Sequence, residues 1–292
     1  MFIKTLKRNQ NKKTHELKSC IRDTGLKNIF NPSIVEKNKK IFITFRAYND
    51  KKIKPFNSFY LIKDGKKTTL FNLTELVKPF GVNIVADPKL IAMKKSVYVT
   101  FNTGYIKEGN QLYLMKLYPQ IGFPKLCVFR HRNKIEKNWG FFLSSQNKIR
   151  AVYSLNPLVI LEVEKEEYKK LEFVEIYTSN NSFKNYTIGT QPVIYNNKLH
   201  LIGHKKIFIN KKRLYIGKLV IININKNFDI KFNSNYFVHS LRSLFGTKVK
   251  HNKNLISCTY FSSLSKTSKG LMLGYGINDV DFNIAEIKNN AY

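Results

Sequence analysis

The sequence predicts an all-β fold, a five-bladed β-propeller with four-stranded antiparallel blades, as one domain over residues 1–292. Two observations carry this prediction. One hairpin pattern recurs five times along the chain, and strand-like apolar runs lie between its copies, whereas stretches with helical periodicity are scarce. A two-sheet sandwich is the alternative, but it does not explain one hairpin at nearly constant spacing.

Each copy of the hairpin pattern begins with a small or polar residue, often before proline. An apolar strand, a polar turn and an alternating strand follow. The copies span residues 31–46, 87–102, 138–153, 191–204 and, with a turn at 251–254, 246–260. Successive copies begin 51 to 56 residues apart, which is the length of a four-stranded blade with its loops. The outer strands are predicted at 59–62, 112–117, 159–163 and 214–224.

The first 28 residues are the most loosely patterned, and we expect them to form an edge strand or a cap. The opening turns quickly to Lys, Asn and Gln, so we expect no secretory signal, and no apolar run approaches the roughly eighteen residues needed to span a bilayer. Cys20, Cys127 and Cys258 lie far apart without metal-ligand or disulfide spacing. We therefore expect a cytoplasmic protein with no metal and no cofactor.

The charge of the chain is strongly positive, with 51 Lys and Arg against 19 Asp and Glu and a formal net charge of +32. Such a field attracts polyanions, including nucleic acid, an anionic membrane surface and sugar phosphates. A compositional bias toward lysine, scattered over hairpin turns, explains the same excess. Charge alone does not select the partner. Nucleic acid is disfavoured, and peripheral contact with an anionic membrane on the cytoplasmic side remains an expectation.

Equivalent positions of the repeat are expected to meet at one place. The innermost strand of every propeller blade runs beside the central axis, so the ends of these strands converge there. The first positions are Asn31, Asp87, Asn138, Gln191 and Gly246, and the last are Arg46, Asn102, Tyr153, His204 and Tyr260. Nearly all can form hydrogen bonds, as a pocket for a ligand with many hydroxyl groups requires.

Asp87 is the only carboxylate among these ten positions. An inverting reaction at a sugar carbon needs proton transfer to or from an oxygen, which one positioned carboxylate can supply, although an Asp-Pro pair alone is a common turn opener. Basic side chains are candidates for holding phosphate or a donor, and the planar guanidinium of Arg46 suits that task best. They are Arg46, Lys89, Lys137, His204, Lys205, His239 and Arg242. The lysines could instead lie on the solvated surface. His204 could instead form a hydrogen bond with a neighbouring carbonyl.

Sugar contact is the predicted task of the remaining candidates, Asn31, Asn102, Asn138, Trp139, Tyr153, Gln191, Tyr260, Asn278 and Asp279. Trp139, the only tryptophan, could stack on a sugar ring or pack in the core. Asn278 and Asp279 close a Gly-Tyr-Gly-Ile-Asn-Asp segment that could form a turn or a pocket rim. The sequence contains no phosphate-binding loop, dinucleotide-binding fingerprint, nucleophile elbow or metal-spaced motif, so those enzyme classes are disfavoured.

Several segments together resemble a known family. They are Asn31-Pro32 with Phe45-Arg46, Asp87-Pro88-Lys89, the Glu-Lys-Asn-Trp of 136–139, the Tyr-Ser-Leu-Asn-Pro of 153–157, the Gly-Thr-Gln-Pro of 189–192 and the Tyr-Gly-Ile-Asn-Asp of 275–279. They are similar to the five-bladed propeller group of inverting β-mannoside phosphorylases and related β-1,2-mannosyltransferases, over about residues 31–287. The resemblance implies that Asp87 is the single catalytic acid or base, acting through a sugar hydroxyl. Arg46 matches the arginine of the first blade and Lys137 the lysine of Lys-Asn-Trp, in a family where Arg, Lys and His hold phosphate.

Two positions depart from the family motif, because Ala86 stands in place of Glu and Lys89 in place of Arg, and the closing segment is more similar to the transferase members. We therefore expect an inverting, mannosyl-type glycosyltransferase that takes a sugar nucleotide or sugar phosphate as donor and a glycan as acceptor. Asp87 would act as base on the acceptor hydroxyl, while basic residues stabilise the phosphate leaving group. The alternatives are an inverting β-mannoside phosphorylase or hydrolase, and a non-enzymatic propeller that binds polyanions or glycans.

Overall fold

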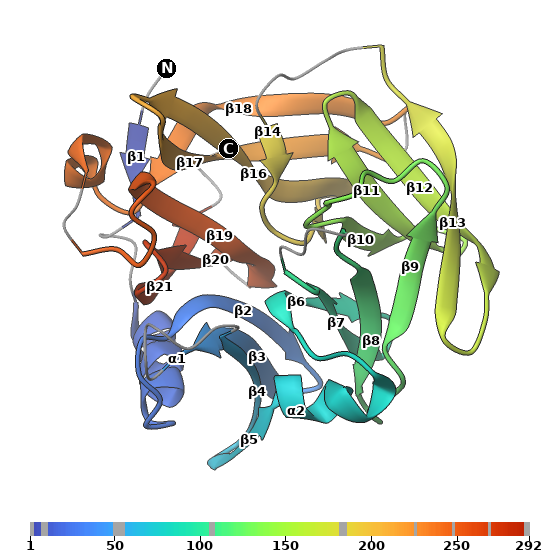
Figure 1. Ribbon diagram of the computed structural model, residues 1–292, viewed down its shortest axis with the longest axis horizontal. Coiled ribbons are helices and arrows are strands. Elements are labelled where there is room, and N and C mark those ends of the chain that lie inside the picture. The colour runs from blue at the N-terminus through green and yellow to red at the C-terminus, as the bar shows by residue number, and fades with distance from the viewer. Residues whose placement is uncertain are drawn as a thin grey trace.

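The computed structural model describes residues 3–6, 11–48, 56–104, 109–180, 186–224, 227–246, 249–267 and 270–288. Within these ranges strands far outnumber helices, so the all-β prediction is confirmed. The strands form antiparallel units that follow one another around a centre, from the blue and cyan strands through green and yellow to the red ones (Figure 1).

Each unit is built from one continuous segment of the chain. The first contains β2 (Phe30–Lys37), β3 (Lys40–Ala47), β4 (Asn57–Asp64) and β5 (Lys67–Asn72), and the second contains β6 (Ala86–Met93), β7 (Ser96–Asn102), β8 (Leu112–Tyr118) and β9 (Lys125–Phe129). The third contains β10 (Gly140–Leu143), β11 (Ile149–Leu155), β12 (Leu158–Glu166) and β13 (Lys170–Thr178). The fourth contains β14 (Tyr186–Ile188), β15 (Val193–Tyr195), β16 (Lys198–Ile209), β17 (Lys212–Asn223) and β18 (Asp229–Val238), and the last contains β19 (Leu255–Thr267), β20 (Gly270–Ile277) and β21 (Asp281–Lys288). The helices α2 (Leu73–Val77) and η1 (Lys78–Phe80) connect the first two units, and η2 (Leu241–Phe245) precedes the last one.

Two parallel ladders join strands of neighbouring units. β9 pairs with β13, and β17 pairs with β19, so the strands group into sheets of nine, eight and four. The number of blades and the single domain therefore stay predictions at this point.

The repeat pattern matches the hairpins of the first four units, which are β2–β3, β6–β7, β10–β11 and β15–β16. The predicted fifth hairpin at 246–260 is wrong. Residues 249–254 are irregular, because the run Lys250-His-Asn-Lys-Asn254 has no apolar side chains to bury, and the strand β19 begins only at Leu255. The hairpin of this unit is β19–β20 instead.

Asparagine is common in the hairpin turns for a conformational reason. Asn38-Lys39, Asn196-Asn197 and Asn210-Lys211 all have positive φ at both residues, between 47° and 62°. Two-residue hairpins favour this geometry because it matches the twist of the strands, and asparagine tolerates it better than most side chains.

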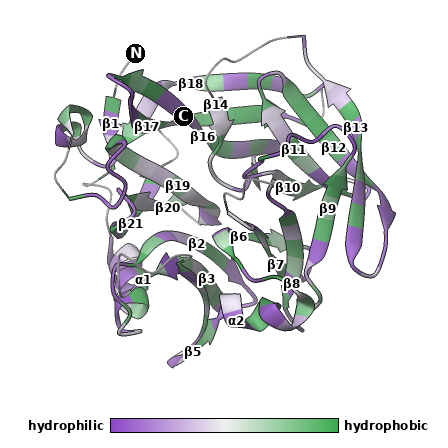
Figure 2. Cartoon of the chain, viewed as in Figure 1, coloured by the Kyte–Doolittle hydropathy of each residue, from purple (hydrophilic) through white to green (hydrophobic). Residues whose placement is uncertain are grey.

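The core lies between the facing sheets of neighbouring units. Phe42 and Tyr60 of the first unit pack with Val99 and Phe101 of the second, and a similar cluster joins the second and third units around Trp139. Figure 2 shows hydrophobic residues along the strands and hydrophilic ones at many hairpin ends. Packing on both faces fixes the inner strands, whose ends carry the predicted site residues.

The N-terminal arm contains a strand and a helix, and it contacts units far away in sequence. β1 (Ile3–Thr5) adds a parallel edge strand to β18. The helix α1 (Lys12–Arg22) begins with a capping box between Asn11 and Thr14. Its apolar side packs against β21 as well as the first unit, with Leu17 in one buried cluster with Ile284. No helix within the described ranges is long and apolar enough to cross a membrane.

Candidate functional site

A repeated irregularity at the start of two inner strands builds the site. The β2–β3 pairing slips by one residue between Phe30 and Ser33, and the β6–β7 pairing slips in the same way after Ala86. Asn31 and Asp87 lie in these bulges with φ of 54° and 50°, in the left-handed region that Asn and Asp tolerate. A bulge redirects side chains, so the Asn-Pro and Asp-Pro pairs mark the places where the chain turns polar groups toward the axis.

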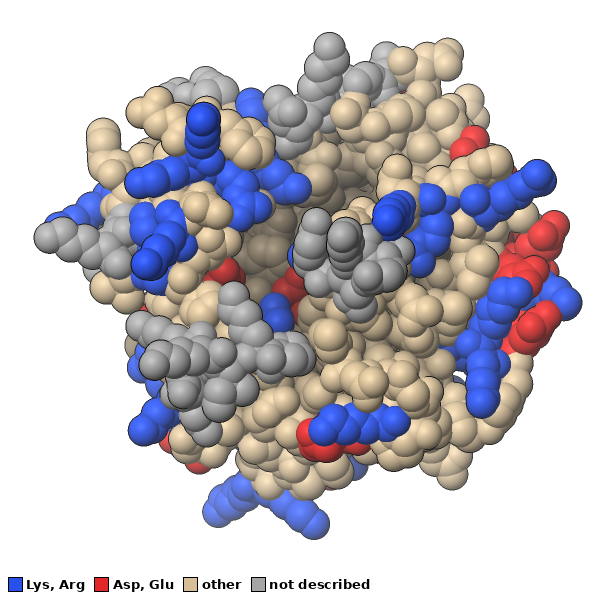
Figure 3. Space-filling model, viewed as in Figure 1, with Lys and Arg blue, Asp and Glu red and all other residues tan. Residues whose placement is uncertain are grey.

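The redirected side chains line an axial pocket of about 500 Å³. It brings together three first positions of the repeat and three last ones, Asn31, Asp87, Asn138, Arg46, His204 and Tyr260. The predicted residues Lys137 and Asp279 also line it. Figure 3 shows a hollow at the middle of this face with acidic and basic side chains at its wall.

Asp87 forms an ion pair with Arg46 inside the pocket. The two atoms Oδ1 and Nη1 are 3.2 Å apart, and the side chains are only 10% and 15% exposed. The Arg46 guanidinium also lies 5.3 Å from the ring centre of Phe30, which limits its movement. Burial acts to raise the pKa of Asp87, but the charges of Arg46, Lys137 and Lys89 outweigh it and hold that pKa below its ordinary value. Asp87 is therefore an ionised carboxylate, able to accept a proton.

Asp279 supplies a second carboxyl group to the same pocket. Burial raises its pKa, and the charge of Asp87 raises it further against the opposing charge of Arg46. Two carboxyl groups in one pocket thus have pKa values shifted in opposite directions. A Cβ at Gly276 would overlap the Asn31 side chain, so this glycine lets β20 pass close to the bulge.

Sequence reasoning missed two further cations that line the pocket, Lys206 and Arg213. Lys206 lies opposite Tyr215 in the β16–β17 ladder, and Arg213 is two residues from Tyr215, so all three side chains share one face. Burial lowers the pKa of Lys206, and the charges of Arg213 and Lys137 lower it further. The two-residue period of a strand could have identified Lys206, because it follows His204 by two residues and so lies on the same face.

Lys205, by contrast, lies on the other face of β16. Its Nζ donates to the Tyr236 hydroxyl at 3.3 Å and lies 5.7 Å from the ring centre of Tyr186. The structure also places His239 and Arg242 outside the axial pocket, where they line a separate hollow beside η2. Burial lowers the pKa of His239 to about 4, and its Nδ1 lies 2.8 Å from the Thr259 hydroxyl. These three residues do not contribute to the axial site.

His204 lines the pocket but serves as a neutral group. Its Nε2 accepts a hydrogen bond from the Phe261 N–H at 2.8 Å, and burial lowers its pKa to about 3. It can therefore offer only Nδ1–H to a ligand. Lys89 is 1% exposed and donates to the Gly189 carbonyl, and burial lowers its pKa to about 7. Lys89 does not line the pocket, but its charge lowers the pKa of Asp87.

Several inner-strand side chains link one unit to the next. Gln191 accepts from the Phe141 N–H and donates to the Trp139 carbonyl, both at 2.8 Å. Ser33 accepts from the Leu90 N–H, and Ser263 accepts from the Ile34 N–H, each at 2.9 Å. Polar side chains at these strand ends therefore hold neighbouring sheets together, which competes with ligand binding as the reason for their presence.

The other predicted sugar contacts have structural partners. The Trp139 Nε1 donates to Glu136 at 3.0 Å, and the Tyr153 hydroxyl donates to the same carboxylate, so the core interpretation of Trp139 fits. Asn102 donates to the Ala86 carbonyl at 3.3 Å, and Asn278 accepts from the Cys258 N–H at 2.8 Å. None of these four lines the axial pocket.

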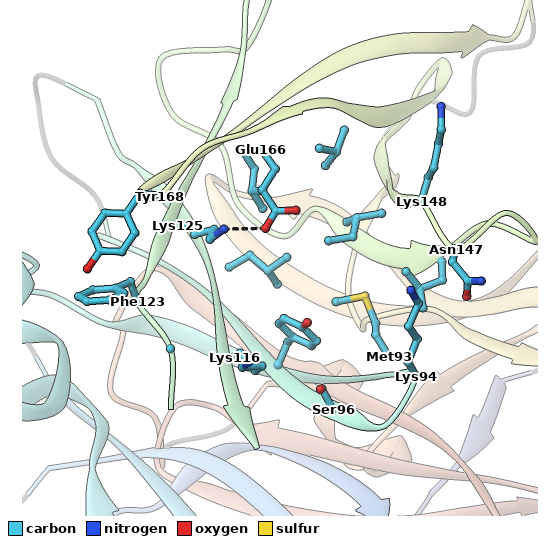
Figure 4. Close-up of a pocket in the computed structure, with 17 residues that line it drawn as sticks. Met93, Lys94, Ser96, Lys116, Phe123, Lys125, Asn147, Lys148, Glu166 and Tyr168 are labelled. Atoms are coloured by element: carbon cyan, nitrogen blue, oxygen red, sulfur yellow. Dashed lines mark hydrogen bonds and ion pairs between the residues drawn. The ribbon is translucent and has the colours of Figure 1, made fainter. Parts of the chain in front are cut away.

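A second cavity, of about 620 Å³, lies between the second and third units (Figure 4). Its wall carries the ion pair of Lys125 and Glu166, 2.6 Å apart, and the ring of Phe123 lies 4.4 Å from that of Tyr168. It contains none of the predicted site residues. In the described part of the chain no cluster of His, Cys, Asp and Glu could hold a metal. The axial pocket is therefore the candidate site.

No family model matches this chain, and no curated protein matches it. Solved structures are similar to it. A glycosyl hydrolase from Bacteroides ovatus has a TM-score of 0.61 at 9% identity, covering 90% of this chain and 84% of its own. A mannose phosphorylase from Leishmania mexicana, in complex with a phosphate ion, has a TM-score of 0.59 at 11% identity, covering 96% and 95%. A GDP-mannose-dependent mannosyltransferase from the same organism has a TM-score of 0.56 at 12% identity, covering 90% and 84%.

These likenesses show the fold. The fold of these enzymes is a propeller, which sets aside the two-sheet sandwich. Because the matched proteins include a hydrolase, a phosphorylase and a transferase, the fold alone does not identify the reaction.

Proposed function

We propose that this chain is a carbohydrate-active enzyme, an inverting, mannosyl-type glycosyltransferase that moves a sugar from a phosphate-activated donor to a glycan acceptor. The observation that carries the proposal is that one pocket holds the ionised Asp87 together with Lys137, Lys206 and Arg213. Among the residues that the structure describes, these three cations form no ion pair with a carboxylate. We also propose that the successive units are the blades of a five-bladed propeller, which the near-constant spacing of the first four hairpins supports.

Asp87 acts as the base in this mechanism. The acceptor hydroxyl attacks the anomeric carbon from the face opposite the phosphate and gives its proton to the Asp87 carboxylate. The bond from the anomeric carbon to the phosphate oxygen breaks, and its electron pair leaves with the phosphate, so the configuration inverts. The ion pair with Arg46 holds the carboxylate in place and in its ionised form.

The three cations are suited to hold the phosphate. Lys206, Arg213 and Lys137 lie close enough for the charges of the other two to lower the pKa of Lys206, and a bound anion would relieve that repulsion. They would also stabilise the negative charge that develops on the leaving group. The buried Nε of Arg46 has no hydrogen-bond partner within the described ranges, so it too can donate to a ligand oxygen.

Hydroxyl groups of the sugar would contact the uncharged wall of the pocket. Tyr260 donates to Asn138 at 3.4 Å, and burial raises the pKa of Tyr260, so that its hydroxyl stays protonated. Asp279, whose pKa is raised, adds a second carboxyl group to the same pocket. We propose that Asn31, Asn138, Tyr260 and Asp279 bind sugar.

A phosphorylase is the second candidate, because a mannose phosphorylase with bound phosphate shares the fold and the same cations would hold inorganic phosphate. Asp87 would then be an acid acting through a sugar hydroxyl. The test is a screen of sugar nucleotides, sugar 1-phosphates, inorganic phosphate and water against mannose-containing oligosaccharides. Product formation only with inorganic phosphate would assign the phosphorylase, and formation only with water would assign the hydrolase.

Substitutions then test the assigned roles. Asp87→Asn is expected to lose several orders of magnitude in rate. Arg213→Met is expected to raise the KM for the phosphate-bearing partner, while Lys205→Met, on the opposite face of the same hairpin, leaves it unchanged. An Asp87→Asn variant with full activity would refute the mechanism. Polyanion binding that collapses with salt and ignores Asp87→Asn, without turnover of any sugar, would assign the non-enzymatic binder.

A further inference from the structure

Five large apolar side chains are exposed beside η2. Phe245 is 90% exposed, Val249 69%, Phe208 67%, Leu241 55% and Ile209 48%. η2 is held in place by Leu244, which packs against the buried cluster of Leu214, Ile216, Tyr236 and Val238. Folding therefore anchors one side of this short helix and leaves Leu241 and Phe245 in solvent, at a cost that a partner could recover.

Phe245 and Val249 line one hollow, and Ile209 lies beside it. Ile209 stands at the tip of the β16–β17 hairpin and pairs with Lys212, whereas Phe208 pairs with Arg213 and so lies on the other face. Lys212, Phe245 and Val249 line the same hollow of about 920 Å³, together with Arg242 and Lys250. We call Ile209, Leu241, Phe245 and Val249, together with Lys212, Arg242 and Lys250, the η2 patch.

The segment of the chain that carries the patch is rich in positive charge. Residues 198–256 include 13 Lys and Arg against a single acidic residue, Asp229. Figure 3 shows Lys and Arg side chains gathered over this side of the molecule, at the upper left of the view. Among the residues that line the patch hollow in the described chain, none is acidic.

We propose that the η2 patch binds an anionic membrane surface. Exposed Leu, Ile, Val and Phe side chains surrounded by Lys and Arg suit an interface where apolar groups enter the headgroup region and cations meet anionic lipid. A nucleic acid would engage the cations and stack on Phe245, but it would leave Leu241 and Val249 in water. The aliphatic side chains therefore favour lipid over nucleic acid.

The patch hollow and the axial pocket share a wall. Arg213 and Leu255 line the axial pocket. Their chain neighbours Lys212 and Ile256 line the patch hollow. The proposal does not depend on which reaction the pocket catalyses.

The test compares binding of the purified protein to vesicles of phosphatidylcholine alone and of phosphatidylcholine mixed with phosphatidylglycerol. Because the net charge of +32 favours any anionic surface, the decisive variant keeps the charge. Leu241→Ser with Phe245→Ser is expected to weaken binding to the anionic vesicles about tenfold or more. The matched control, Ile176→Ser with Ile194→Ser, changes two exposed apolar residues elsewhere and is expected to bind like the wild type.

A second pair tests the cations. Arg242→Gln with Lys250→Gln is expected to weaken binding more than Lys94→Gln with Lys95→Gln, which removes the same charge from an exposed turn. In a Phe245→Trp variant, anionic vesicles should shift the added tryptophan emission to shorter wavelength. Equal losses in patch and control variants, absence of that shift, or patch substitutions that weaken oligonucleotide binding but not vesicle binding would each overturn the proposal.

Discussion

The buried His204 makes stability depend on pH in a way that can be calculated. In the folded chain its pKa is about 3, because burial disfavours the charged ring, while its Nε2 accepts the Phe261 N–H. In the unfolded chain we take the ordinary value of about 6.5. Between these values the unfolded state binds a proton that the folded state does not, so stability falls as the pH falls through this window. At pH 5, which is about 1.5 units below the unfolded pKa, the loss in the free energy of unfolding is about 2 kcal/mol.

The variant that isolates this effect is His204→Gln, whose amide oxygen can still accept the Phe261 N–H but does not titrate. Urea unfolding at pH 7 and pH 5 is expected to show that the wild type loses about 2 kcal/mol more than the variant over that interval. His131→Gln, at an exposed position, is the control and should follow the wild type. If the wild type and His204→Gln lose the same stability, His204 is not held neutral in the way that the geometry implies.

Three further predictions concern the surroundings of the site. Lys89 has a folded pKa of about 7 against about 10.5 unfolded, so the wild type should gain stability as the pH rises from 7 to 9; Lys89→Met should lack that gain of about 2 kcal/mol in urea unfolding. Gly276→Ala places a Cβ against the Asn31 side chain and should cost about 1 to 3 kcal/mol, visible as a lower urea midpoint, whereas Gly65→Ala meets no neighbouring atom and tests the effect of positive φ alone. Leu17→Ala removes a side chain that is 1% exposed between α1 and β21 and should cost about 2 to 5 kcal/mol, so an unchanged midpoint would show that the N-terminal arm does not support the fold.

The sequence predicted the fold well where period-two alternation and the spacing of Asn-Pro and Asp-Pro agreed. It failed at 246–260, where a polar run resembled a hairpin turn although no apolar strand preceded it. The register also identified Asn31, Asp87 and Arg46 as neighbours of the axis, because equivalent bulges place them there.

Other parts of the site depended on facts that a pattern does not contain. Gln191 occupies a register position but faces the neighbouring strand, and its amide bonds to backbone rather than lining the pocket. Strand alternation puts residues 204 and 206 on one face of β16, and it therefore indicates Lys206 rather than Lys205 as the pocket residue. The opposite pKa shifts of Asp87 and Asp279 arise from residues almost two hundred positions apart, so only the folded chain brings them together.

The N-terminal arm bears on the order in which the ring is completed during synthesis. Residues 3–22 leave the ribosome before the rest of the described chain, yet their partners β18 and β21 are made more than 200 residues later. Contacts of such long sequence separation form late, because closing the intervening loop costs entropy before the contact contributes any stability. Until β21 emerges, Leu17 and Ile21 have no complete surface to cover them, so a nascent or shortened chain exposes an apolar helix face that chaperones can bind. Docking of the arm thus requires that β21 has already been made.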